Sequence, residues 1–86
     1  MAYDLRAMAY YSAGMIGPAV EDLANALALE PLHFPALAGL GTIFENRGEL
    51  EKALSAYQMA AEIHPFMVDV NDAIKRLKTQ IEGQEL

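Results

Sequence analysis

The chain has 86 residues, no cysteine and a formal net charge of −6. This length allows one small domain, and the missing cysteines exclude disulfides and thiolate zinc sites. The acidic balance argues against a nucleic-acid or membrane-surface partner, because no basic stripe is present to neutralise phosphates. No apolar run approaches the roughly 20 residues of a membrane span, and no secretory leader opens the chain. We therefore expect a soluble domain whose compartment is not defined.

The first helix is expected over residues 2–13, and its face away from the second helix is small and apolar, with Ala2, Ala9 and Ala13. In a stack of repeats this face receives the preceding repeat, whereas an end repeat usually turns a polar face to solvent. We therefore expect the chain to be the C-terminal part of a longer protein. The alternative is that the same face pairs with another copy of the chain.

A turn over residues 14–17 leads to the second helix, which is expected over residues 18–30. Pro18 suits the first helical position, where its missing N–H costs nothing. Glu21 and Asp22 are then expected in the first turn, where acidic side chains interact favourably with the helix dipole. They are not a catalytic carboxylate pair, because adjacent residues on a helix do not face each other.

The third helix is expected over residues 35–47 and the fourth over residues 49–64, with Gly48 between them. The third carries large or small apolar residues at i, i+3, i+4 and i+7, which is one face of a helix: Leu37, Leu40, Gly41 and Phe44.

The last helix is expected to begin at residue 68 or 69 and to reach about Glu82, with Gly83–Leu86 as a tail. Its apolar residues form one narrow stripe: Val70, Ile74, Leu77 and Ile81. The positions that would receive a further helix are polar: Asn71, Lys75 and Lys78. We therefore expect this helix to close the stack, since solenoids need polar caps for solubility.

The chain repeats itself with a period of 34 residues. Residues 34 positions apart have side chains of similar size but are mostly not identical. A fixed period of this length indicates a repeat architecture. In the second unit the repeated positions are Leu37, Leu40, Gly41, Phe44, Gly48, Ala53, Tyr57, Ala60 and Pro65. In the first unit they are Tyr3, Arg6, Ala7, Tyr10, Gly14, Ala19, Leu23, Ala26 and Pro31.

These residues resemble the signature of the tetratricopeptide repeat (TPR) family, with two departures in the first unit. Arg6 stands where leucine is usual, and Leu23 stands where an aromatic residue is usual. The resemblance implies an all-α fold: an α-solenoid of two helix-turn-helix units and a C-terminal capping helix, five helices in total. The units are expected at about 1–33 and 34–67, and the cap at about 68–82.

No constellation for catalysis, a cofactor or a metal is visible. His33 and His64 lie near the links between repeats without a carboxylate or cysteine at metal-ligand spacing. Neither Ser12 nor Ser55 sits in a nucleophile turn. Gly39 and Gly41 lie inside an expected helix and follow no strand, so they do not form a phosphate loop. We therefore expect a non-enzymatic protein without cofactor or metal.

The resemblance implies a concave groove lined by the first helix of each repeat, where TPR proteins bind peptides or helices. The residues expected there are Asp4, Met8, Tyr11, Ser12, Thr42, Glu45, Asn46, Asp72 and Arg76. TPR proteins that clamp a chaperone's C-terminal carboxylate place Lys, Asn and Arg on this surface. Here the corresponding positions hold Asp4, Met8, Ala38 and Thr42, which argues against that function.

The expected function is therefore a protein-interaction module, an adaptor or scaffold, that binds a neutral or basic segment with Tyr11 and Met8 as anchors. Two alternatives remain open. One is self-assembly through the Ala2/Ala9/Ala13 face, and the other is an accessory domain of an enzyme whose catalytic part lies upstream. The style of the repeats resembles bacterial TPR proteins.

Overall fold

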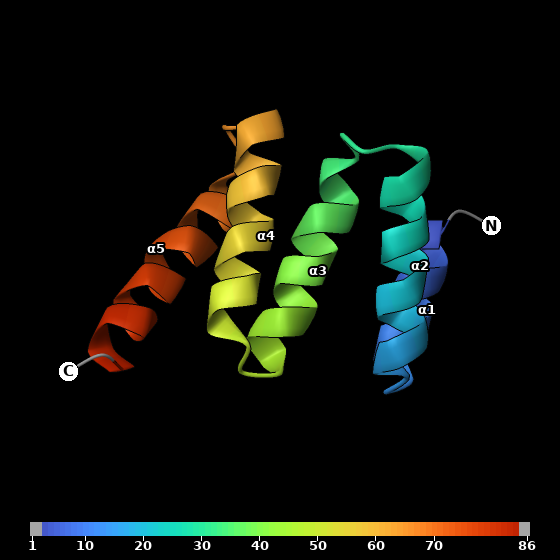
Figure 1. The fold of residues 1–86 in the computed structure, drawn as a ribbon, viewed down its shortest axis with the longest axis horizontal. Helices are drawn as coiled ribbons and strands as arrows, with labels where there is room; N and C mark the ends of the chain where they lie inside the picture. Colours follow the sequence, from blue (N-terminus) through green and yellow to red (C-terminus); the bar gives the residue numbers. More distant parts are fainter. Residues whose placement is uncertain (1–2, 85–86) are drawn as a thin grey trace.

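A computed structural model of the chain describes the backbone of residues 3–84 and the side chains of residues 6–84. The described residues form five α-helices: α1 Tyr3–Ser12, α2 Ile16–Leu29, α3 Phe34–Asn46, α4 Leu50–Ile63 and α5 Val68–Gln84. The helices α1 and α2 form one antiparallel pair and α3 and α4 form the next, while α5 packs on α4 (Figure 1). The expected all-α solenoid of two helical hairpins and a last helix is confirmed.

Two glycines end the first helix of each pair in the same way. Gly14 and Gly48 have φ angles of +80° and +78°, a left-handed conformation that glycine adopts without steric cost. The Met15 N–H bonds the Tyr10 carbonyl at 2.8 Å, and the Glu49 N–H bonds the Phe44 carbonyl at 2.9 Å. This is the Schellman pattern, which satisfies carbonyls at a helix end and reverses the chain.

Several expected helix ends differ from the observed ones. The helix α2 begins at Ile16, so Pro18 is its third residue and not its first. The proline is tolerated because the first intrahelical bond is made by the Ala19 N–H, to the Met15 carbonyl. The helix α5 continues to Gln84, so Gly83 belongs to the helix and not to a tail.

The helix α3 contributes to two apolar clusters on its two sides. Ala36 and Ile43 pack with the first hairpin, in a cluster that also contains Ala7, Ala19, Leu23 and Ala26. Leu37 packs with the second hairpin and α5, in a cluster that also contains Ala53, Tyr57, Ala60, Val70, Ala73 and Leu77. The sequence pattern indicated one apolar face for this helix and missed Ala36 and Ile43, because a helix between two neighbours is buried on more than one side.

Gly41 of α3 lies directly against the Tyr57 ring of α4. A Cβ atom at Gly41 would lie 2.9 Å from three ring carbons of Tyr57, closer than real Cβ atoms come. The Tyr57 side chain therefore occupies the space that the missing Gly41 side chain leaves. A side chain at residue 41 would therefore have to displace the Tyr57 ring.

Candidate functional site

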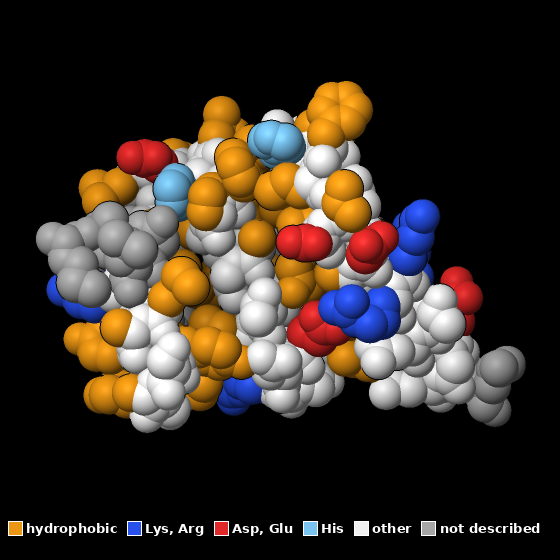
Figure 2. Space-filling model, turned by 180° about the vertical axis from the view of Figure 1, so that it is seen from behind, with side chains coloured by type: hydrophobic (Ala, Val, Ile, Leu, Met, Phe, Trp, Pro, Cys, Tyr) orange, Lys and Arg blue, Asp and Glu red, His pale blue; other side chains and the backbone are white. Residues whose placement is uncertain are grey.

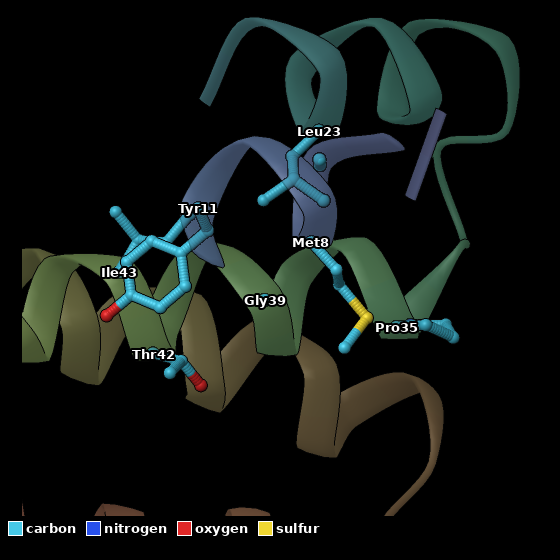
Figure 3. A pocket seen from close by; sticks show the side chains of 8 residues that line it. Met8, Tyr11, Leu23, Pro35, Gly39, Thr42 and Ile43 are labelled. Carbon is cyan, nitrogen blue, oxygen red and sulfur yellow. The ribbon is translucent and has the colours of Figure 1, made fainter. Parts of the chain in front are cut away.

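A cavity of about 290 Å³ lies between α1 and α3. Met8 and Tyr11 extend from α1 toward α3, on either side of Gly39, and Leu23 of α2 closes the inner end (Figure 3). Three of the residues expected in the groove therefore line one cavity, namely Met8, Tyr11 and Thr42. Met8 is 67% exposed, so its side chain forms part of the rim that a partner would meet.

The remaining lining residues were not predicted as site residues: Ala7, Leu23, Pro35, Gly39 and Ile43. The sequence pattern assigns Gly39 no site role, because it lies inside an expected helix and not in a phosphate loop. It lies between Met8 and Tyr11 in the view of the cavity and contributes no side chain to the wall (Figure 3). A Cβ atom at Gly39 would lie 3.3 Å from a methyl carbon of Leu23. A glycine inside an otherwise helical segment, one turn from another small residue, was the available signal.

A polar network joins the groove residues of α3 to α4 and α5. The Arg76 guanidinium donates two hydrogen bonds of 2.8 Å to the Glu45 carboxylate. The Tyr57 hydroxyl lies 3.0 Å from the Thr42 hydroxyl and donates to Glu45 Oε1 at 3.4 Å. Burial raises the pKa of the Tyr57 hydroxyl, and the hydrogen bond from Arg76 to Glu45 raises the pKa of Arg76. The expected groove residues Glu45 and Arg76 thus bind each other.

The other expected groove residues occupy different settings. The Asn46 side-chain amide donates to the Tyr11 hydroxyl, which ties α3 to α1. Ser12 and Asp72 are exposed, and the Asp72 charge helps to raise the pKa of Arg76. The side chain of Asp4 lies outside the described residues.

Arg6 and Asp22 form an ion pair that the sequence did not predict. The guanidinium donates to the two carboxylate oxygens at 2.8 and 2.7 Å, and Asp22 is buried, with 4% of its surface exposed. These hydrogen bonds hold the pKa of Asp22 below its usual value. The expected dipole role of Glu21 and Asp22 is wrong, because α2 begins at Ile16 and both residues lie beyond its first turn.

The two histidines lie near the links between helices, as expected. The His64 ring lies 5.0 Å from the Phe34 ring, and His33 Nδ1 lies 3.4 Å from the Glu30 carboxylate. Within residues 6–84, no three His, Cys, Asp or Glu side chains are grouped so that they could hold a metal ion. No helix of the described part combines the length and apolar character that crossing a membrane requires.

The small face of α1 is only partly described. Ala9 and Ala13 are exposed, whereas Ala2 lies outside the described residues. Two residues of the expected self-assembly face are therefore open to contact.

No family model matches the chain. A TPR repeat-containing protein from Rhizobium etli is 26% identical to it over 82 residues, which are 95% of this chain and 40% of the relative. The chain thus spans less than half the length of that relative.

Among solved structures, the first TPR of Spaghetti (RPAP3), bound to the HSP90 peptide SRMEEVD, superposes with a TM-score of 0.85. The match is 21% identical and covers 93% of this chain and 64% of the other. The two comparisons support the resemblance to TPR proteins, and the structural likeness shows that the fold is that of a TPR solenoid.

Proposed function

We propose that the chain is a protein-interaction module that binds a peptide or a helix in the groove between α1, α3 and α5, without chemistry of its own. The observation that carries this proposal is the apolar cavity lined by Met8, Tyr11 and Thr42. Ligand sites are usually concave and largely apolar with few polar groups. The structural neighbour with the same fold is bound to a peptide, which supports the general class of partner.

The groove face combines two kinds of surface. Figure 2 views the molecule from the side on which α1 and α5 lie in front, with hydrophobic side chains toward α1 and charged side chains together toward α5. Met8 and Tyr11 supply the apolar part, whereas Glu45 and Arg76 bind each other in the charged part. A segment that crosses both parts would gain burial at one end and orientation at the other.

The test is a selection from a random dodecapeptide library against the 86-residue chain, followed by titration of the enriched peptides. Met8→Glu places a charge at the cavity rim, and we expect it to abolish binding. Met59→Glu is the matched control, because Met59 is also exposed, at 51%, but lies on α4 and not among the residues that line the cavity. Peptides that bind Met8→Glu as well as the unchanged chain would contradict the proposal, and so would a selection without enriched peptides.

The exposed Ala9 and Ala13 favour one second candidate, self-assembly through the first helix. Light scattering across a concentration series tests it. A dimer that Ala9→Glu converts to a monomer would support self-assembly, whereas a monomer at all concentrations would contradict it.

A further inference from the structure

The walls of the cavity between α1 and α3 offer almost no free polar group. Its polar side chains are Tyr11 and Thr42, and both already have partners. The Tyr11 hydroxyl accepts a hydrogen bond from Asn46. The Thr42 hydroxyl donates to the Ala38 carbonyl at 3.1 Å and also lies 3.0 Å from the Tyr57 hydroxyl. An occupant of the cavity therefore meets carbon and sulfur surfaces and gains mainly by burying apolar area.

The size of the cavity suits one side chain. Ligand pockets for whole small molecules span about 300–1,000 Å³, and this cavity, at about 290 Å³, lies at the lower limit. Gly39 contributes no side chain to the wall, and Met8 at the rim has a flexible thioether that adapts to the shape of a neighbour. A large aliphatic, methionine or aromatic side chain of a partner matches these walls.

The charges beside the cavity favour a basic partner. The Tyr57 hydroxyl contacts Thr42, which lines the cavity, and it also contacts Glu45. The charged cluster of Glu45, Asp72 and Arg76 therefore lies next to the cavity. In this cluster Arg76 pairs with Glu45, and Asp72 also acts on Arg76. Asp72 lies one turn before Arg76 on the same face of α5, so the three side chains together carry one net negative charge. The cluster attracts an ammonium or guanidinium group more strongly than a carboxylate.

A terminal carboxylate would find little to bind it on this surface. The Arg76 guanidinium on α5 binds Glu45, and the Arg6 guanidinium on α1 binds the buried Asp22. An incoming carboxylate would compete with these bidentate pairs, and it would also approach Asp72. The acidic excess of the whole chain, twelve acidic against six basic residues, acts in the same direction.

From this arrangement we infer that the groove binds an internal segment of a protein through one large apolar side chain, with a lysine or arginine beside it. The apolar side chain enters the cavity between Met8 and Tyr11, and the basic group lies beside Glu45 and Asp72. The inference rests on the proposed function, because it names the chemistry of the segment that the same groove takes. It differs from recognition of a C-terminal carboxylate.

Two arms of the dodecapeptide selection test the inference. In one arm the random segment is fused at both ends, and in the other its C-terminus is free. We expect the first arm to enrich segments with one large apolar residue and a nearby lysine or arginine. Enrichment only of acidic segments with a free C-terminus, still dependent on Met8, would overturn the inference while the proposed function stands. Binding that does not depend on Met8 would contradict the proposed function itself.

Titration of the most enriched internal peptide then tests each group. Replacing its apolar residue by alanine should weaken binding about 10- to 100-fold, the loss expected for one buried large side chain. Replacing its basic residue by a neutral one should weaken binding about two- to fivefold, as for one exposed ion pair. Equal affinity of the peptide and either replacement would overturn the inference.

A variant of the protein tests the same ion pair from the other side. Asp72→Asn should weaken binding of the enriched basic peptide and leave unchanged the affinity for the peptide with the neutral replacement. Glu62→Gln is the matched control, because Glu62 is an exposed carboxylate on α4 that lies with Gln58 and Lys78, away from the cavity. A loss that is the same for Glu62→Gln, or for the neutral peptide, would contradict the assigned position of the basic group.

Discussion

The two hairpins have the same helical pairing but use different chemistry to hold it. In the first hairpin the buried Asp22 binds Arg6, whereas the residues 34 positions later are Leu40 and Ala56. Leu23 in the first hairpin corresponds to Tyr57 in the second, where the ring packs against Gly41. The first repeat therefore has an ion pair and Leu23 at positions where the second repeat has two apolar residues and an aromatic ring.

This difference shapes the groove. Beside the first hairpin the groove is apolar and hollow, with Leu23 at the inner end of the cavity. Beside the second hairpin the hydroxyl of Tyr57 reaches Thr42 and Glu45, and the surface is polar and internally bonded. One of the two departures from the TPR signature, Leu23 in place of an aromatic residue, thus lies at the apolar end of the groove.

The largest effect is expected from a substitution at the contact between Gly41 and Tyr57 in the second hairpin. Gly41→Leu should lower the free energy of unfolding by about 1–3 kcal/mol or more, because overpacking forces the helices apart, and its Cβ alone would lie 2.9 Å from Tyr57 ring carbons. Urea denaturation measures the change. Gly17→Ala is the control, because a Cβ at Gly17 meets nothing within 4 Å. An unchanged unfolding midpoint for Gly41→Leu would show that this contact does not fix the helices.

The next effect breaks the ion pair of the first hairpin. Arg6→Leu leaves the buried Asp22 without its guanidinium partner and should lower the melting temperature, because the desolvation cost of the buried carboxylate is then no longer compensated. The double variant Arg6→Leu/Asp22→Ala has the residues that the second repeat carries at these positions. It should recover most of the lost melting temperature, since apolar replacements of buried ion pairs are often neutral or stabilising. Equal melting temperatures of the single variant and the unchanged chain would contradict the structural role of the pair.

A smaller effect concerns the hydroxyl of the second hairpin. Tyr57→Phe removes the contacts to Thr42 and Glu45 and should lower the free energy of unfolding by about 0.5–1.5 kcal/mol. Tyr10→Phe is the matched control, because no hydrogen bond of the Tyr10 hydroxyl is found among the described residues. Similar losses for the two variants would show that the network contributes no specific stability.

The smallest effect is a difference in how the free energy of unfolding depends on pH in the unchanged chain and in the double variant. The pKa of Asp22 is lower in the folded than in the unfolded chain, so its stabilisation is fully present above the unfolded value. It is lost as the pH falls through the folded pKa. The double variant Arg6→Leu/Asp22→Ala lacks this contribution, so its free energy of unfolding should decline less on acidification than that of the unchanged chain. Parallel declines would contradict the lowered pKa of Asp22.

The repeat period, the helix count and the glycine turns could be predicted because each depends on local spacing. That Met8, Tyr11 and Thr42 point to one side of the molecule could be predicted because helical positions fix side-chain direction, and the three line one cavity. The Arg6–Asp22 pair could not be predicted, since it joins two helices and depended on a helix start that was placed two residues late. Nor could Gly39 be recognised as a cavity residue, because the contact between Gly39 and Leu23 depends on how α2 and α3 pack.

The most direct test of the groove as the binding site is methyl NMR of the methionines, with the most enriched peptide as ligand. Met8 lines the cavity, and Met59 lies on α4 outside it, so the two methyl groups report on the two surfaces in one sample. We expect the peptide to shift the Met8 signal and to leave the Met59 signal in place. A shift at Met59 with none at Met8 would show that the partner binds outside the groove.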